Sequence, residues 1–181
     1  MKWVWLSLKA LGLLLLVIAG GLWLAGRRAS AGHLHSEIEV KRPAAEVWDW
    51  VSEPEKMKQW VSWLVDVRTD DMGHGGVGVK RVLVMRDENN GGQLMEIQGT
   101  CTEYTPPNLL RMNLVVPGAF DGTQAYRVTD LGNGSSRLEI DSQFHFGNPF
   151  AKLMEPVITP SAQKKMRRDI ARLKQLAEES R

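Results

Sequence analysis

Residues 37–63, EIEVKRPAAEVWDWVSEPEKMKQWVSW, decide the architecture of this chain. Polar and apolar residues alternate at 36–40, which is the period of a strand with one buried face. Pro43 suits the first turn of a helix, and apolar residues recur at helical spacing over 44–51. A second short helical segment follows at 53–60, with a proline near its start. The stretch therefore predicts a strand followed directly by two short helices.

Tryptophan is concentrated in the same stretch, which holds four of the chain's seven: Trp48, Trp50, Trp60 and Trp63. Trp48 and Val51 are three residues apart and can share a helix face, whereas Trp50 points elsewhere. For Trp48 we favour a structural role in capping the core. Trp60 and Trp63 fall at the corner between the second helix and the next strand. That position suits capping of the core and closure of a cavity equally well.

The chain from residue 63 to residue 146 has the pattern of strands and turns. Short loops rich in Gly, Pro, Asn and Asp separate the apolar segments, so consecutive strands are expected to form an antiparallel meander. In the last segment Leu138, Ile140 and Phe144 alternate with Glu139 and Asp141, which predicts one buried and one exposed face. The six strands expected after the two helices are 63–69, 77–86, 93–104, 109–116, 123–130 and 136–146.

A long amphipathic helix is expected at the C-terminus. Asn148 and Pro149 indicate a short capped turn, and Thr159 with Pro160 then begins the main helix as N-cap and first helical residue. One apolar stripe runs along it, formed by Met166, Ile170, Leu173 and Ala177. The available partner for that stripe is the apolar face of the sheet.

The same helix carries a run of basic residues at 164–174, KKMRRDIARLK. Such a run is typical of the solvated face of an amphipathic helix. Contact with anionic lipid headgroups is the alternative interpretation. The basic side chains are Lys164, Lys165, Arg167, Arg168, Arg172 and Lys174.

The N-terminal segment differs in composition from the rest. Residues 3–26 are apolar apart from Ser7 and Lys9, and three further tryptophans lie near the two ends of the segment. A helix of this length can cross a hydrocarbon core of about 30 Å, and interfacial tryptophans are favoured at such ends. The segment therefore predicts a transmembrane helix.

We accordingly divide the chain into an anchor at 1–28, a linker at 29–33 and a folded domain at 34–181. The protein is then expected at a membrane as a single-pass protein, with the domain on the exported side. A cleaved signal peptide, with ASA at 29–31 as its cleavage site, is the alternative interpretation.

Composition excludes several classes of protein. The formal net charge of +2 over 181 residues argues against a dedicated nucleic-acid binder, which usually carries a strongly basic field. The single cysteine, Cys101, rules out an internal disulfide framework and a multi-cysteine zinc site. Cys101 is expected to be a small buried residue.

The order of elements, one strand, two short helices, six strands and a long helix, resembles the SRPBCC superfamily. This superfamily shares the helix-grip fold of START-type lipid carriers and polyketide cyclase/dehydrase-like proteins. The resemblance extends over 34–181 and is carried by 37–63, by GTCTEYTPPNLLRMNL at 99–114, by YRVTDLGNGSSRLEI at 126–140 and by MRRDIARLKQLAEES at 166–180. It implies an α+β fold in which a seven-stranded antiparallel sheet wraps around the long C-terminal helix, and in which the two short helices close one end. Its motifs specify the architecture and leave the activity open.

The resemblance implies an elongated cavity between the sheet and the terminal helix. Apolar residues on the expected inner face, methionines among them, suit a hydrophobic ligand of imprecise shape. The alternative is that the same side chains fill a closed core. The polar groups on that face are Arg81, Cys101, Tyr126 and Ser142, and one or two of them are candidates to orient a ligand. The candidate cavity residues are Trp48, Trp60, Trp63, Arg81, Leu83, Met85, Met95, Ile97, Met112, Leu114, Tyr126, Ser142, Phe144, Met166 and Ile170.

The histidines, the cysteine and one glycine-rich segment are the places where catalytic, metal-binding or cofactor motifs would be expected. His33 and His35 fall in the expected linker, His74 in a glycine-rich turn and His145 on the expected solvent face, so none is an evident base for Cys101. Neither HLH at 33–35 nor the turn around His74 has a second half with metal-ligand spacing. GHGGVG, at 73–78, has the letters of a dinucleotide motif, but a strand follows it where a helix should begin. We therefore expect no catalytic residue, metal site or cofactor.

These features predict a membrane-tethered domain that binds a hydrophobic small molecule or lipid in an internal cavity, for transfer or sequestration. Its expected partners are that ligand and the membrane, with no nucleic acid. One alternative is a polyketide cyclase or aromatase-like enzyme, in which Arg81 or Tyr126 would contact the substrate. Another is an interaction module whose core is filled by its own side chains.

Overall fold

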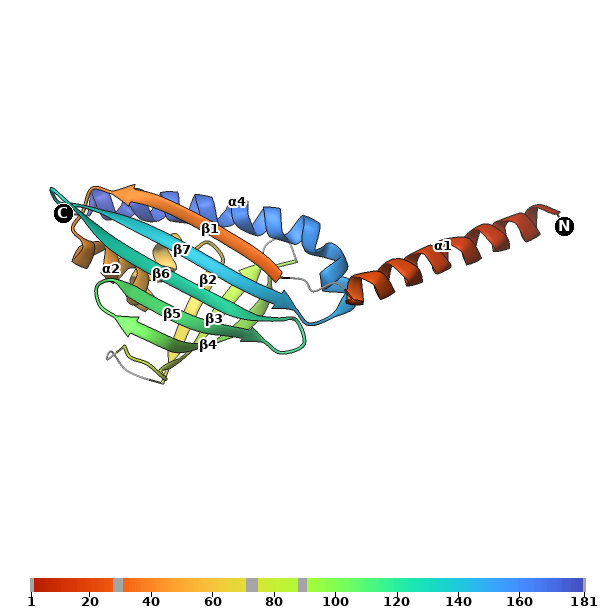
Figure 1. Ribbon diagram of the computed structural model, residues 1–181, viewed down its shortest axis with the longest axis horizontal. Helices are drawn as coiled ribbons and strands as arrows, with labels where there is room; N and C mark the ends of the chain where they lie inside the picture. Colours follow the sequence, from red (N-terminus) through yellow and green to blue (C-terminus); the bar gives the residue numbers. More distant parts are fainter. Residues whose placement is uncertain (1, 28–30, 71–74, 88–90, 181) are drawn as a thin grey trace.

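The computed structural model describes residues 2–27, 31–70, 75–87 and 91–180 (Figure 1). The helices in these ranges are α1 (Lys2–Arg27), α2 (Ala44–Ser52), α3 (Pro54–Trp60) and α4 (Pro149–Glu179). The strands are β1 (Ala31–Val40), β2 (Leu64–Thr69), β3 (Lys80–Asp87), β4 (Gln93–Thr105), β5 (Leu109–Val116), β6 (Phe120–Gly132) and β7 (Ser135–Phe146). The expected turn at 71–74, with His74, and part of the expected turn after β3, at 88–90, lie outside the described residues.

The strands form a single antiparallel sheet in the order β1-β7-β6-β5-β4-β3-β2. From β2 to β7 the neighbours in the sheet are neighbours in the sequence, so the predicted meander is confirmed. β1 closes the other edge by pairing with β7. This order places the first and last strands side by side, and α4 lies along them (Figure 1).

β1 is longer than the sequence predicts. It begins at Ala31, five residues before the expected start, because its first half pairs with the end of β7, where Ala31 lies opposite His145. His33 and His35 therefore belong to a strand. Both are on its outer face beside Asp141, with Nε2 of His33 2.8 Å and Nδ1 of His35 3.6 Å from Oδ2 of Asp141.

α4 is one continuous helix that begins eleven residues before the main helix expected from the sequence. The side chain of Asn148 caps its N-terminus by accepting a hydrogen bond from the Ala151 N–H at 2.7 Å. Thr159 is inside the helix, so its expected role as N-cap is wrong. Pro156 and Pro160 are also inside it. Each removes one backbone donor without ending the helix, because the turns on both sides keep their own hydrogen bonds.

The hydrophobic core lies at the end of the domain where α2 packs against the sheet and α4. Leu138 and Leu173 are fully buried there, as are Val47 and Val51 from α2. The alternation predicted for β7 is confirmed, since Leu138 and Ile140 are buried and the intervening side chains are more exposed. The core thus fixes α2 and the C-terminal half of α4 on one part of the inner face of the sheet.

α1 extends away from the sheet, and its C-terminal end lies beside the start of α4 (Figure 1). Its described side chains include leucines with more than half of their surface exposed, such as Leu13 at 65% and Leu16 at 71%. Among the helices of the described residues, none combines the length and the hydropathy required to cross a membrane.

Candidate ligand-binding site

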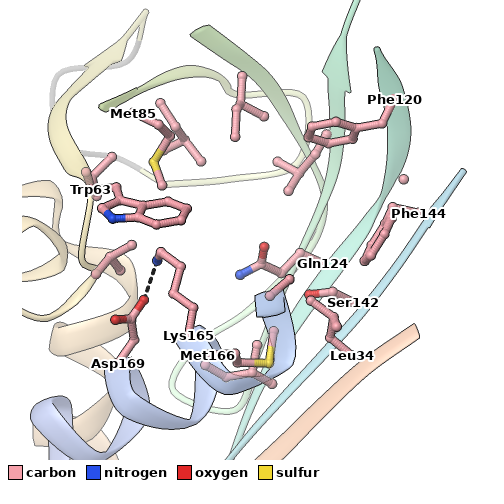
Figure 2. Close-up of a pocket in the computed structure, with 18 of the residues that line it drawn as sticks. Leu34, Trp63, Met85, Phe120, Gln124, Ser142, Phe144, Lys165, Met166 and Asp169 are labelled. Atoms are coloured by element: carbon pink, nitrogen blue, oxygen red, sulfur yellow. Dashed lines mark hydrogen bonds and ion pairs between the residues drawn. The ribbon is translucent and has the colours of Figure 1, made fainter. Parts of the chain in front are cut away.

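The inner face of the sheet is not completely filled by the core. Beyond the buried cluster, the sheet, α3 and α4 enclose a cavity of about 360 Å³ (Figure 2). This volume falls within the range of pockets that hold small molecules. The cavity lies between the middle of α4, at Ala162 and Met166, and the strands facing it, and the corner at 60–64 forms one end.

Most of the residues predicted for the cavity do line it. They share an apolar or weakly polar side chain on the inner face of a strand, at the corner after α3, or on the stripe of α4. The lining positions among those predicted are Trp60, Trp63, Leu83, Met85, Met95, Ile97, Leu114, Tyr126, Ser142, Phe144 and Met166.

The other predicted positions, Trp48, Arg81, Met112 and Ile170, do not line the cavity. Trp48, Met112 and Ile170 are buried in the core, where Trp48 packs against Tyr104 with ring centroids 5.6 Å apart. The guanidinium of Arg81 donates to the carbonyl oxygen of Ser52, 3.1 Å away, at the end of α2. All four lie at the end of the domain where α2 packs, so they meet protein instead of the cavity.

Two charged residues of the lining were missed by sequence reasoning. Lys165 was assigned to the solvated basic face of the terminal helix, yet only 14% of its side chain is exposed, and Asp169, one turn later, is 9% exposed. Nζ of Lys165 lies 2.5 Å from Oδ2 of Asp169. The spacing of these two residues in the sequence indicates their position on the helix. Lys165 and Asp169 are four residues apart and directly precede Met166 and Ile170, so they occupy the border of the apolar stripe.

The carboxylate of Asp169 accepts hydrogen bonds from two side chains. Its Oδ1 accepts a hydrogen bond from the hydroxyl of Ser62 at 2.6 Å, and its Oδ2 accepts the bond from Lys165. Ser62 belongs to the corner between α3 and β2, so this network joins that corner to α4. A buried carboxylate needs such compensation, because removing it from water without partners costs several kcal/mol.

Trp63 covers the other side of the Lys165 ammonium. The ring centroid of Trp63 lies 5.0 Å from Nζ of Lys165, which is cation–π distance. Trp63 has a φ of 74°, in the left-handed region that bulky residues rarely adopt. Its carbonyl oxygen accepts the backbone N–H of Arg86 at 2.7 Å, which ties this conformation to β3. The strained corner thereby aims an indole into the cavity, between Met85 and Lys165 (Figure 2).

Trp60 is buried at the same corner. Its ring is 2% exposed, and its indole N–H donates to the carbonyl oxygen of Trp50 at 2.7 Å. The ring meets Tyr126 edge-on, with centroids 6.4 Å apart. Trp60 and Trp63 therefore combine the two roles considered for them, since each packs at the corner and lines the cavity.

The remaining polar groups lie on the sheet, across from Lys165 (Figure 2). The side-chain amide of Gln124 donates to the hydroxyl of Tyr126. Complete burial raises the pKa of the Tyr126 phenol well above its usual range, so this group stays neutral at physiological pH. The hydroxyl of Ser142 is buried without a hydrogen-bond partner among the described residues. Nearby, Cys101 is 5% exposed, as expected, and burial raises the pKa of its thiol.

Comparison with known proteins supports the assignment of the fold. Among solved structures, the chain is similar to a conserved protein from Geobacillus kaustophilus, with a TM-score of 0.65 and 11% identity over 80% of this chain and 94% of that one. It is also similar to norcoclaurine synthase from Thalictrum flavum, solved with dopamine and hydroxybenzaldehyde, with a TM-score of 0.59 and 18% identity over 84% and 90% of the two chains. A protein from Rhizobium leguminosarum gives 0.61 and 16% identity over 84% and 99%. At such identities the likeness establishes the fold alone.

Comparison at the level of sequence identifies the family of the chain. No curated protein matches it in sequence. The sequence model of the family described as polyketide cyclase/dehydrase and lipid transport matches residues 31–178, which include all of the sheet and nearly all of α4. The predicted resemblance to helix-grip proteins is thereby confirmed. The chain belongs to the polyketide cyclase/dehydrase and lipid transport family.

Proposed function

We propose that this protein binds a hydrophobic small molecule or lipid in the cavity between its sheet and α4. The observation that carries the proposal is an open cavity of about 360 Å³ with almost entirely apolar walls, in a family that includes lipid transport proteins. Burying apolar ligand surface at about 25 cal/mol per Å² supplies affinity without any catalytic group. The methionines of the lining, Met85, Met95 and Met166 among them, are flexible enough to adapt to ligands of different shape.

Native mass spectrometry tests this proposal. The full chain would be purified gently from its source membranes and measured before and after solvent extraction, and the extract would be identified. A bound hydrophobe released by extraction is the expected result. A clean apo mass, with no uptake of N-phenyl-1-naphthylamine by the extracted protein, would contradict the proposal and indicate that the cavity closes in solution.

We further propose that α1 holds the domain at a membrane, with the domain on the exported side. The supporting observation is the exposed apolar surface of α1, where several leucines, Val17 and Ile18 project without cover from the domain. Such a surface is unstable in water, and a bilayer is a suitable environment for it. A tether would keep the cavity close to lipids that it could extract.

Flotation with phospholipid vesicles tests the tether. We expect the full chain to float, and Leu16→Lys to float less, because a charge on the apolar surface of α1 opposes its association with lipid. Leu131→Lys, the same change at an exposed leucine of β6, is the matched control. Equal flotation of the two variants would contradict the proposal. Protease protection in sealed vesicles from the source then reports the side on which the domain lies.

A further inference from the structure

The wall of the cavity contains one strong hydrogen-bond donor that the protein leaves partly unused. The ammonium of Lys165 has three N–H donors. Among the described residues its hydrogen-bond acceptor is Oδ2 of Asp169, and a second side of the ammonium faces the Trp63 ring. The remaining donor capacity is directed toward the cavity, with Gln124 on the opposite wall (Figure 2).

Each carboxylate oxygen beside this ammonium already accepts one hydrogen bond. Oδ1 of Asp169 accepts from Ser62, and Oδ2 accepts from Lys165. The hydrogen-bonding capacity left at this point of the wall includes N–H donors of Lys165. An acceptor atom on the ligand is the complement of this site, because it would pair with a donor whose side chain is largely buried.

The net charge of the cavity wall determines whether a charged or an uncharged acceptor on the ligand is favoured. Lys165 and Asp169 form a buried pair whose charges cancel, and no other charged side chain lines the cavity among the described residues. The guanidinium of Arg81 donates to the carbonyl oxygen of Ser52, and Arg81 lies outside the lining. A carboxylate on the ligand would add an uncompensated negative charge to this apolar space, which is costly. An uncharged oxygen accepts the same hydrogen bond without that cost.

We infer that the ligand is an uncharged hydrophobe with a hydrogen-bond-accepting oxygen, such as a ketone, aldehyde or ester, and that Lys165 donates to this oxygen. Asp169 and Ser62 act as positioning residues that hold the ammonium against the cavity. This inference rests on the proposed binding function and specifies the chemical class of its ligand.

The test compares three ligands with the same carbon chain length, which are decane, decan-2-one and decanoate. Each would displace N-phenyl-1-naphthylamine from the full chain, and the ratio of the decane and decan-2-one dissociation constants would be measured. The variant Lys165→Met/Asp169→Asn removes both charges while keeping most of the length of the Lys165 side chain and an acceptor for Ser62. We expect the preference for the ketone over the alkane to fall about 10-fold in this variant, since it loses a charge-assisted hydrogen bond.

Lys164→Met is the matched control, because Lys164 is the exposed neighbour on the same helix and should leave the ratio unchanged. A ratio unaltered by the double variant overturns the inference. So does tighter binding of decanoate than of decan-2-one to the wild type. If the wild type takes up no probe at all, the binding function itself is refuted, which is a different outcome from loss of selectivity.

A second measurement needs no variant. The carbonyl stretch of ¹³C-labelled decan-2-one bound to the wild-type chain should lie at lower frequency than in an alkane solvent, because donation from an ammonium weakens the C=O bond. A bound ketone with the frequency of the alkane solution would overturn the inference even if the double variant failed to fold.

Discussion

At the scale of single residues, the site depends on a few side chains whose environment differs from their usual one. Lys165 belongs to a basic run, but it is buried between Trp63 and Asp169. Trp63 adopts a positive φ that aims its ring at that ammonium. Lysine and tryptophan are thus placed by contacts with other elements, against the preferences of their own segments.

The Lys165–Asp169 pair makes a prediction about stability. Lys165→Met leaves the Asp169 carboxylate buried without a counter-ion, and we expect a loss of about 3 kcal/mol in the free energy of unfolding. The double variant Lys165→Met/Asp169→Asn should lose far less, because no unpaired charge remains. Urea denaturation measures both. Lys164→Met should change stability by less than about 0.5 kcal/mol. Equal losses in the single and double variants would show that the pair is not coupled.

Gly122 makes a second prediction at this scale. It lines the cavity from β6, and a Cβ there would lie 2.2 Å from the carbonyl oxygen of Gln143 in β7. Because that neighbour is backbone, it cannot move aside cheaply, and Gly122→Ala should destabilise the fold by about 2 kcal/mol. Gly147→Ala, where the nearest atom is 3.6 Å away, is the control with ordinary contacts. Chemical denaturation of the two variants compares them, and similar midpoints would contradict this account.

At the scale of elements, α4 has two halves with different surroundings. Its C-terminal half, with Leu173 and Ala177, is anchored in the core. Its N-terminal half contains Pro156 and Pro160 and exposes Phe150 and Val157, at 67% and 59%. Ile158 and Ala162, near the junction of the halves, line the cavity. The cavity therefore lies at the junction of the two halves, where Lys165 and Met166 line it as well.

Hydrogen exchange should distinguish the two halves. We expect amides of 151–159 to exchange faster than those of 166–177, because prolines remove helix hydrogen bonds and few buried contacts hold the first half. Pro160→Ala restores one N–H donor and should slow exchange in the first half only. Mass spectrometry of exchanged peptides measures this. Uniform protection along α4 in the wild type would show that the prolines do not weaken it.

At the scale of the whole molecule, the inner face of the sheet is shared between a packed core and an open cavity. α2 and the C-terminal half of α4 close one end around Leu138 and Leu173, while the corner at Trp60 and Trp63 bounds the cavity. Domains of this kind gain their stability from the core and can leave a separate part of the same face for a ligand.

Filling the cavity should therefore remove binding without unfolding the protein. Ala162→Phe projects a ring from α4 into the cavity, and we expect uptake of N-phenyl-1-naphthylamine to be lost while the free energy of unfolding changes by less than about 1.5 kcal/mol. Ala171→Phe, at an exposed position of the same helix, should bind the probe as the wild type does. Probe fluorescence and thermal melting are the measurements. Undiminished uptake by Ala162→Phe would place the binding site elsewhere.

Local patterns were sufficient for the order of elements and for most of the lining. Alternation in β7 marked Leu138 and Ile140 as buried, and helical spacing marked Met166 and Leu173 on one stripe, because the period of a segment decides which side chains share a face. The N-terminal extension of α4 was not evident, because proline usually ends a helix, and continuation through Pro156 and Pro160 depends on the neighbouring turns.

The sequence by itself determined the class of fold, the antiparallel meander and the inward phase of its strands, since these follow from local periodicity. Only the tertiary structure decided how far β1 extends along β7, where the core ends and the cavity begins, and that Lys165 faces the cavity. Met166 and Ile170 share the apolar stripe of α4, yet Ile170 is in the core and Met166 lines the cavity. The physical reason is that burial against a distant element depends on the curvature of the sheet and the rotation of α4, which no single segment encodes.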